Sequence, residues 1–542
     1  MNKPLDIAIV NAHVYTLNDM DEEAEAVGIS GKTISVVGHT EEVTKLSGEN
    51  TRLIDAKRKV VLPGFIDSHC HLAFYGLSLS QPDLRGATSK DEVLDLVRRA
   101  AREKEKGHWI IVDYLRGWQE SKWKGDKTYI RKEELNQVAP ENPTALSRID
   151  GHLCSVNSKA LEILNIPVGT LGYEVEAGEP TGILREPALH KLDDMPDLEP
   201  GVEELVCSLR PAIKKAHELG VTSVHEMKLQ YKNREIRAYR ELQDSGELQV
   251  RVSLSFEVKH LDEMINLGLS PRFGDEKLRL GAVKIFLDGS KAARTAALIE
   301  PYHDAPSERG TLLWKGEELE NRIIRAHQND IQLAIHSVGD RATELVLNCF
   351  EKANQQKRKN LRHRIEHLAV ASRSQIERVK NLDLMASMQP SFLQIWGLPG
   401  GDDEARLGTE KYQQANPYAW VIEQGIKLAF GSDVLPFSPL FGIHCAANAA
   451  FSSQKLSPKD AFRAYTRGGA YATFEEELKG SIEEGKLADL IIMSQNPFFE
   501  PHKIKDMDVE LTIFDGKIVY DKLKTSSDIE GSPVLSAGLF RL

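Results

Sequence analysis

Eight apolar segments, separated by stretches with helical spacing, occupy the middle of the chain and constrain its fold more than any other feature. Strands that alternate with helices are typical of parallel β-sheets, and eight such strands close a TIM barrel. We therefore predict an α/β fold, a TIM (β/α)8 barrel. Its expected strands are FIDSHCHL, VTSVHEM, LQVRVSLSF, GAVKIFLDG, IQLAIHSV, HRIEHLAV, LMASMQP and KLAFGSD.

Both ends of the chain alternate apolar and polar residues with the period of β-strands, as in DIAIVNAHVYTL and VELTIFDGKIVYD. Isolated hairpins are marginally stable, so we expect residues 1–62 and 480–542 to meet in one discontinuous β-sandwich. The barrel would then occupy residues 63–479. Residues 77–205, after its first strand, form a stretch too long for a loop, and we predict an inserted subdomain that covers the barrel mouth.

Side chains that can bind metal gather at the carboxyl ends of the predicted strands, where TIM barrels carry their active sites. His69 and His71 end the first strand and should point the same way, because side chains in a strand alternate. Each such residue alone has a structural explanation, but their joint placement favours a metal site. Four further strands end in or carry Lys284 (followed by Asp288), His336, His363 with His367 on one face, and Asp433.

Lys284 stands on an otherwise apolar strand, and an ammonium group is costly to bury without a partner. Two explanations remain open. Lys284 forms an ion pair with Asp288, or burial lowers its pKa so that it reacts with carbon dioxide. The resulting carbamate is an anion that can bridge two metal ions.

Composition and charge exclude several kinds of partner. The formal net charge is −12 and no basic patch occurs, which argues against nucleic acid or an anionic membrane. Five scattered cysteines indicate reduced thiols, and no apolar run approaches the ~18 residues of a membrane helix. We expect a cytoplasmic protein with a small-molecule substrate. A homodimer is its expected assembly.

The motifs DSHCH, VKIFLDGS, AIHSVGDRA, HRIEH and FGSD together resemble the amidohydrolase superfamily, and the resemblance extends over nearly the whole chain. It is strongest to the family 3 branch, which includes N-substituted formamide deformylase and uncharacterised metal-dependent hydrolases. The resemblance implies one or two divalent ions per chain, with zinc expected. The implied ligands are His69 and His71 for one ion, His336 and His367 for the second, a carboxylated Lys284 between them, and Asp433.

The same resemblance implies hydrolysis of a non-peptide carbon–nitrogen bond, with metal-activated hydroxide attacking an amide carbonyl and Asp433 carrying the proton. Asp150 and His152 in the insertion, and Arg341 after the fifth strand, are expected to contact the substrate. The alternative for the sequence Asp-Gly-His is a structural turn. The alternatives for the protein are a deaminase with one metal ion, which would not need Lys284, and an inactive scaffold of the same fold.

Two segments near the expected substrate site depart from related sequences. Ser391 and Phe392 stand where similar proteins often place a histidine after the Gln-Pro of the seventh strand. Lys291, Ala292 and Ala293 replace a smaller, glycine-containing segment after the fourth strand. The substrate of any relative is therefore a weak guide to the substrate of this chain.

Overall fold

A computed structural model of the protein describes residues 4–149, 151, 153–185, 188–192, 195, 198–229 and 231–522. Its residues divide into two compact units. The first contains Met1–His71, Ile213–Leu229 and Leu242–Leu542, and the second contains Leu72–Ala212 and Gln230–Glu241. The last part of the terminal segment expected in the sandwich, residues 523–542, lies outside the described residues.

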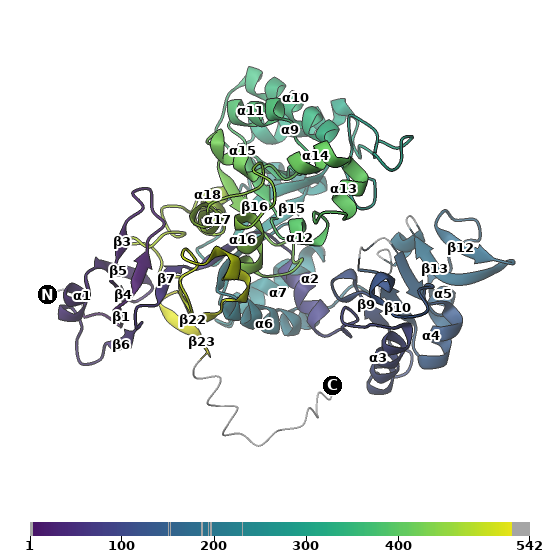
Figure 1. The fold of residues 1–542 in the computed structure, drawn as a ribbon, viewed down its shortest axis with the longest axis horizontal. Coiled ribbons are helices and arrows are strands. Elements are labelled where there is room, and N and C mark those ends of the chain that lie inside the picture. The colour runs from purple at the N-terminus through teal and green to yellow at the C-terminus, as the bar shows by residue number, and fades with distance from the viewer. Residues whose placement is uncertain are drawn as a thin grey trace. The chain divides into compact units, whose positions relative to one another are not determined.

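The first unit contains an eight-stranded parallel sheet in the order β20-β19-β18-β17-β16-β15-β14-β8 (Figure 1). Every predicted strand is present, so the predicted barrel fold is confirmed. The strands are β8 (Phe65–Cys70), β14 (Val221–Glu226), β15 (Arg251–Glu257), β16 (Leu278–Phe286), β17 (Leu333–Ser337), β18 (Arg364–His367), β19 (Met385–Met388) and β20 (Leu428–Phe430).

The first and last strands meet just beyond β20. The backbone N–H of Asp433 donates to the carbonyl oxygen of His69 over 2.8 Å. A Cβ atom at Gly431 would lie 2.3 Å from the backbone nitrogen of His69, so only glycine permits this approach. The closure therefore places the segment after β20 directly beside the histidine-bearing end of β8.

The barrel strands are apolar because both faces of the sheet are covered. Val283, Ile285, Ile335 and Ile365 are fully buried. Helices α9, α10 and α11 lie together on one side of the sheet (Figure 1). The helices of the first unit are α1 (Thr40–Lys45), α8 (Leu261–Asn266), α9 (Gly316–Gln328), α10 (Asp340–Gln356), α11 (Arg373–Asn381), α12 (Phe392–Ile395), α13 (Asp402–Leu407), α14 (Thr409–Gln414), α15 (Tyr418–Glu423), α16 (Pro439–Ala447), α17 (Pro458–Ala464) and α18 (Arg467–Ala472).

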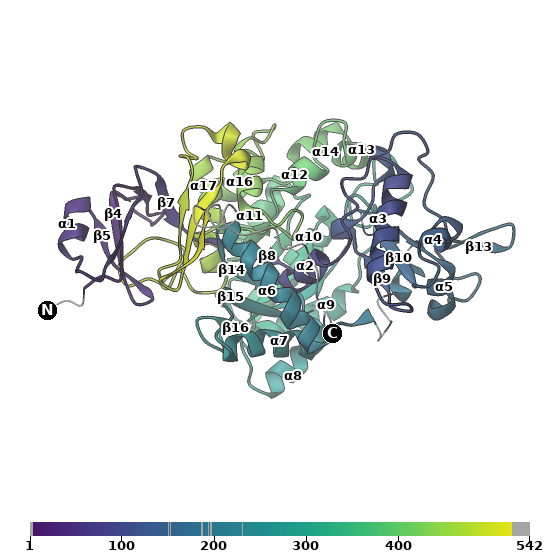
Figure 2. The same cartoon turned by 90° about the horizontal axis from the view of Figure 1, so that it is seen from below.

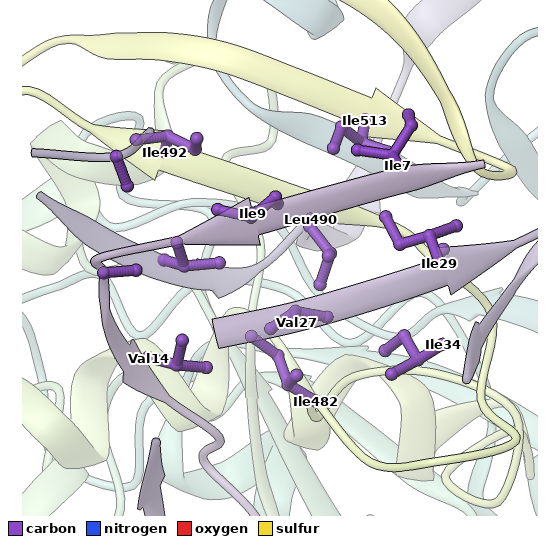
Figure 3. Close-up of a cluster of buried hydrophobic side chains, with 14 of the residues drawn as sticks. Ile7, Ile9, Val14, Val27, Ile29, Ile34, Ile482, Leu490, Ile492 and Ile513 are labelled. Atoms are coloured by element: carbon purple, nitrogen blue, oxygen red, sulfur yellow. The ribbon is translucent and has the colours of Figure 1, made fainter. Parts of the chain in front are cut away.

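Two further sheets of the first unit form the β-sandwich, and the C-terminal strands lie beside N-terminal ones (Figure 2). Isoleucine, leucine and valine side chains from both ends of the chain pack together between the sheets (Figure 3). One sheet has the order β5 (Thr33–Gly38), β4 (Ala26–Ser30), β1 (Ile7–Val10), β6 (Arg52–Asp55). The other has the order β23 (Lys517–Asp521), β22 (Val509–Phe514), β21 (Leu490–Met493), β7 (Val60–Pro63), β2 (His13–Tyr15), β3 (Glu23–Ala24).

A buried ion pair joins the sandwich to the barrel. Arg251, the first residue of β15, donates to both carboxylate oxygens of Asp489 over 2.7 and 3.0 Å. It also donates to Asp515 over 3.1 Å. Arg251 and Asp489 are both buried, so the pair ties the amino-terminal end of a barrel strand to the segment that enters β21.

The second unit has its own sheet, in the order β12-β13-β11-β10-β9, and its own apolar core around Trp118 and Val93. Its elements are α2 (Leu72–Leu79), α3 (Lys90–Glu103), β9 (Ile110–Val112), α4 (Lys132–Val138), β10 (Thr144–Ser147), β11 (Leu153–Val156), α5 (Ser158–Leu164), β12 (Tyr173–Glu176) and β13 (Glu179–Arg185). Helices α6 (Val202–Glu218) and α7 (Lys232–Asp244) contain residues of both units.

Among the described residues, no helix is both long and apolar enough to span a membrane.

Candidate metal centre

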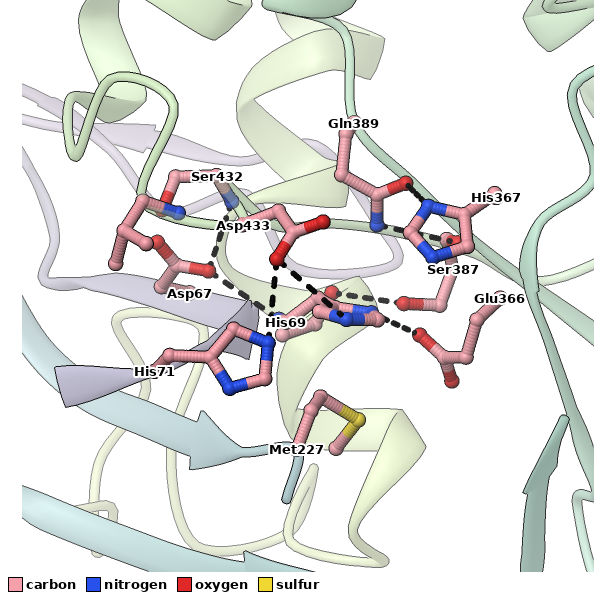
Figure 4. A network of polar contacts seen from close by, with 12 residues as sticks. Asp67, His69, His71, Met227, Glu366, His367, Ser387, Gln389, Ser432 and Asp433 are labelled. Carbon is pink, nitrogen blue, oxygen red and sulfur yellow. Dashed lines mark hydrogen bonds and ion pairs between the residues drawn. The ribbon is translucent and has the colours of Figure 1, made fainter. Parts of the chain in front are cut away.

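Three potential metal ligands meet at the carboxyl end of the barrel (Figure 4). One donor atom each from His69, His367 and Asp433 lies within 4.8 Å of the others. His69 ends β8, His367 ends β18, and Asp433 follows β20. Nitrogen and carboxylate oxygen donors at this spacing suit a divalent ion such as zinc.

Two further predicted ligands lie beside this group. His71 Nε2 is 3.2 Å from Asp433 Oδ1, and the same carboxylate oxygen is 3.9 Å from His69 Nε2. The ring of His336 lies 4.4 Å from that of His367, centroid to centroid. One aspartate thus faces both histidines of the first strand, and the other two histidines form a neighbouring pair.

Two of the candidate ligands have backbone conformations that most residues avoid. His367 has φ 72° and Asp433 has φ 50°, both in the left-handed region. Such conformations cost ~1–3 kcal/mol each and persist where the surrounding structure imposes them. In a regular strand the side chain of His367 would point outward. The turn at this residue brings it into the centre instead.

Glu366 supports the centre although it is not among the predicted ligands. Its carboxylate accepts a hydrogen bond from Nδ1 of His69 over 2.6 Å (Figure 4). Arg364 donates to the other oxygen of Glu366 over 2.6 Å and to the carbonyl oxygen of Ser68 over 2.6 Å. An ionised carboxylate only accepts, so Nδ1 carries the proton and Nε2 of His69 presents its lone pair toward Asp433.

Two more residues that sequence analysis missed hold the ligands in place. Gln389 Oε1 accepts from Nδ1 of His367 over 2.6 Å. Asp67 Oδ1 accepts from the backbone N–H groups of His69 and Ser432 over 3.2 and 2.9 Å, which joins the two segments that carry ligands. Glu366 could have been found from the sequence, because an arginine and a glutamate stand two residues apart in an apolar strand. Gln389 could have been found from its place after the seventh strand.

Lys284 is buried, and its Nζ has no hydrogen-bond partner among the described residues. The alternative in which it pairs with Asp288 is therefore wrong. Asp288 instead accepts from the backbone N–H groups of Ala297, Val338 and Gly339 over 2.8–3.0 Å. The Nζ atom lies 5.0 Å from the centroid of the Phe286 ring, but a buried ammonium group without a hydrogen-bond partner is unfavourable, so this site suits a lysine that loses its charge or gains an anionic group.

The local electrostatics favour metal binding by neutral histidines. Burial, followed by the charge of Lys284, lowers the pKa of His69 to about 4 and that of His336 to about 3. Burial alone would raise the pKa of Asp433, but His69 and His71 hold it well below its usual range. Burial lowers the pKa of Lys284 to about 8, although Glu366 and Asp433 favour its charged form.

The remaining predicted residues have mixed outcomes. The prediction that His363 shares a face with His367 is wrong, because the ring of His363 bonds to His327 of α9 over 3.0 Å and to the backbone N–H of Leu333. Arg341 donates to the carbonyl oxygen of Gly310 over 2.9 Å, and its role toward substrate stays a prediction. Asp150 and His152 lie outside the described residues.

An eight-stranded barrel with histidine and aspartate donors at the carboxyl ends of its strands is an arrangement that suits a metal-dependent enzyme. The chain belongs to the amidohydrolase family, whose sequence model matches residues 52–520. It is thus a metal-dependent amidohydrolase, as its resemblance to that family predicted.

Three similar proteins span nearly its whole length. YtcJ of Bacillus subtilis (strain 168), named as an amidohydrolase, is 31% identical over 94% of this chain and 98% of its own. N-substituted formamide deformylase of Arthrobacter pascens is 27% identical over 96% and 99%. An uncharacterised metal-dependent hydrolase from Pyrococcus furiosus has a TM-score of 0.76 and 29% identity, over 91% of this chain and 99% of its own.

Proposed function

We propose that this protein hydrolyses a non-peptide carbon–nitrogen bond of a small amide with the help of divalent ions held at the candidate metal centre. The meeting of His69, His367 and Asp433 within 4.8 Å at the carboxyl end of a barrel carries the proposal. Family membership and the similarity to N-substituted formamide deformylase support an amide substrate.

Zinc is the ion we propose, because neutral imidazole and carboxylate groups are its common ligands. The proposed ligands are His69, His71, Lys284, His336, His367 and Asp433. The ring of His69 lies nearer to that of His367 than to that of His71, at 4.9 against 5.7 Å between centroids. When bound, such an ion lowers the pKa of a coordinated water toward neutrality and polarises the substrate carbonyl.

The side chains of this centre have separate tasks in the proposed reaction. Asp433 accepts a proton from the attacking water and passes it to the leaving nitrogen, the paired tasks of a general base and a general acid. Glu366 keeps Nδ1 of His69 protonated, so that Nε2 stays available as a ligand. Gln389 fixes the ring of His367 in the same way, through its Oε1 atom.

Lys284 enters the proposal as a carbamate. In its neutral form, the Nζ lone pair attacks the carbon of carbon dioxide, an N–C bond forms while one C=O π bond breaks and gives its electron pair to oxygen, and the nitrogen loses one proton to solvent. The product is an anion with two oxygens, which can bridge two ions. Among the described residues the buried Nζ has no hydrogen-bond partner, and its pKa of about 8 makes the neutral amine accessible at a lower pH than in an exposed lysine; both support this reaction.

A deaminase with a single metal ion remains a second candidate. It is favoured by the observation that, in the described part of the chain, the close group of donors contains three residues, enough for one ion. It has no use for Lys284 as a ligand. Replacing Lys284 should leave its metal content and turnover nearly unchanged, whereas the two-ion hydrolase should lose both.

The remaining expectations concern the setting of the enzyme. The five cysteines are all free, and four of them are buried. Free thiols are typical of a reducing compartment, which supports a cytoplasmic location. A small-molecule substrate, rather than a nucleic acid, fits the acidic balance of the chain.

The proposed activity can be tested with a screen of N-formyl and N-acyl amines, assayed for release of the free amine. The zinc-loaded protein should turn over at least one of them, and a chelator should abolish turnover until zinc is returned. The Asp433→Asn variant serves as the control for contaminating hydrolases. Turnover that survives both the chelator and this substitution would contradict the proposal.

A further inference from the structure

Aromatic rings lie directly beside two of the candidate ligands. The ring of Phe392 is nearly parallel to that of His367, at 6.3 Å between centroids and 10° between planes. Trp396 packs edge-on against Phe392 at 4.6 Å. Phe286, the last residue of β16, lies 5.5 Å from His336. We call Phe286, Phe392 and Trp396 the aromatic group.

The aromatic group is neither core nor free surface. All three side chains are partly exposed, unlike the fully buried Phe65, Phe350 and Phe430. Ile395 and Leu398, on the same segment as Phe392 and Trp396, are 41% and 46% exposed. Single exposed apolar residues are ordinary, but several rings next to metal-ligand histidines leave apolar surface where the substrate would lie.

A buried ion pair holds this segment in place. Lys291 Nζ donates to Asp403 Oδ2 over 2.6 Å, and both side chains are almost fully buried. The backbone N–H of Asp403 in turn donates to the carbonyl oxygen of Trp396 over 3.0 Å. Lys291 belongs to the loop that follows β16, so the pair connects the loop after Lys284 with the segment that carries Phe392.

This ion pair joins the loop after β16 to the segment that carries Phe392 and Trp396, across 112 residues of sequence. Buried ion pairs seldom add net stability, because desolvation offsets the attraction, but they do fix geometry. The pair therefore fixes the segment that carries Phe392 and Trp396 beside His367, which gives these rings the constant position that a binding surface needs.

We propose that the aromatic group binds a planar apolar substituent of the substrate, attached next to the bond that is cleaved. This proposal rests on the proposed function and names the class of amide that the same centre takes. Phe392 and Trp396 would contact the substituent directly, while Lys291 and Asp403 act as positioning residues. An aryl substituent offers a flat face to such rings, which favour offset-stacked and edge-to-face contacts.

The test uses two metal-binding ligands that differ only in their substituent. Acetohydroxamate and benzohydroxamate both chelate a metal ion through two oxygens, and one carries a methyl group where the other carries a phenyl ring. Isothermal titration of the zinc-loaded full chain would give both dissociation constants. We expect benzohydroxamate to bind ~10–100-fold more tightly, as burial of one further ring implies.

Variants show whether that preference comes from the aromatic group. Phe392→Ala should reduce the preference at least about fivefold and leave acetohydroxamate binding unchanged, since it removes apolar contact and no ligand. Phe499→Ala, which alters a phenylalanine that is 77% exposed, is the matched control and should keep the preference. If Phe392→Ala does not fold or bind zinc, Phe392→Leu and Trp396→Ala provide the same comparison.

The outcomes separate this proposal from the proposed function. Equal binding of both hydroxamates by the wild type, or a preference that survives Phe392→Ala and Trp396→Ala, would overturn the aromatic subsite while the metal centre stands. If neither hydroxamate binds the zinc-loaded protein, the metal centre is overturned instead, and the subsite with it. Lys291→Met should reduce the preference for benzohydroxamate less than Phe392→Ala does, because Lys291 acts only as a positioning residue.

Discussion

Glu366 accepts a 2.6 Å hydrogen bond from Nδ1 of His69, while Arg364 binds the other oxygen of the same carboxylate. All three side chains are buried. A carboxylate in this position fixes both the tautomer and the orientation of a metal-binding histidine. A buried arginine and a buried glutamate thus both serve to orient one candidate ligand.

Glu366→Gln should therefore weaken metal binding. Loss of such a partner typically lowers metal affinity ~10–100-fold, and the substitution also leaves Arg364 without its carboxylate. Competition with a chromogenic chelator would measure the affinity. Glu276→Gln, at an exposed ion pair with Lys32, is the control and should leave it unchanged. An unchanged affinity in Glu366→Gln would show that His69 needs no such partner.

Asp433→Asn should remove turnover and leave most of the metal bound. Four histidines and Lys284 would still supply ligands, but asparagine cannot accept a proton near neutral pH. General acid–base catalysis contributes ~10²–10⁴ in rate, so kcat should fall by that factor. Asp383→Asn, at an exposed pair with Arg358, is the matched control. Turnover within a few-fold of wild type would mean that another group carries the proton.

Metal affinity should depend on pH through Lys284. Burial lowers its pKa to about 8, so below pH 8 the folded protein holds it mostly as an ammonium ion, which repels metal and cannot react with carbon dioxide. In bicarbonate buffer the affinity should rise ~10-fold per pH unit from pH 6 to about 8 and level off above it, because one proton is released. His69 and His336, with pKa values of about 4 and 3, are already neutral and add no slope.

Lys284→Met is the variant that isolates this effect. It keeps an unbranched apolar side chain on β16 and removes the titrating nitrogen. Chelator competition across the same pH range should give a nearly flat profile for this variant, at weaker overall affinity. The same rise with pH in both proteins would assign the titration to another group.

Removing one partner of the buried pair between Arg251 and Asp489 should destabilise the fold. Arg251→Met leaves an unpaired carboxylate inside the protein, and breaking a buried pair in this way costs ~3–5 kcal/mol. Denaturant unfolding of the metal-free protein should show this loss of free energy. Lys32→Met removes one partner of the exposed pair with Glu276 and should cost less than ~1 kcal/mol. Equal effects of the two substitutions would contradict a role for burial.

The sequence predicts the barrel and the strand ends that form the candidate metal centre, because both follow simple periodicities. Apolar runs mark the strands, and TIM barrels place functional side chains at the carboxyl ends of those strands. The strand pattern alone places His69, His336 and Asp433 at this rim, whereas their proposed role as ligands came from the resemblance to amidohydrolases. The meeting of the two chain ends also followed from strand patterns that could not be stable separately.

Other features depend on tertiary structure. Strict alternation puts Glu366 and His367 on opposite faces of β18, yet both reach the metal centre, because the backbone turns to φ 72° at His367. No local pattern signals that turn. The pairing of Lys291 with Asp403 is equally hidden, since 112 residues separate them. Sequence located the strand ends, and only the folded chain shows which side chains meet there.

Elemental analysis of the protein purified without added metal tests the central claim most directly. We expect about two equivalents of zinc in the wild type, and a large loss in the variant with both His69→Ala and His367→Ala, which should remain folded by circular dichroism. One equivalent would favour the deaminase with a single ion. No bound metal in the wild type, or full metal content in the double variant, would contradict the metal centre described by His69, His367 and Asp433.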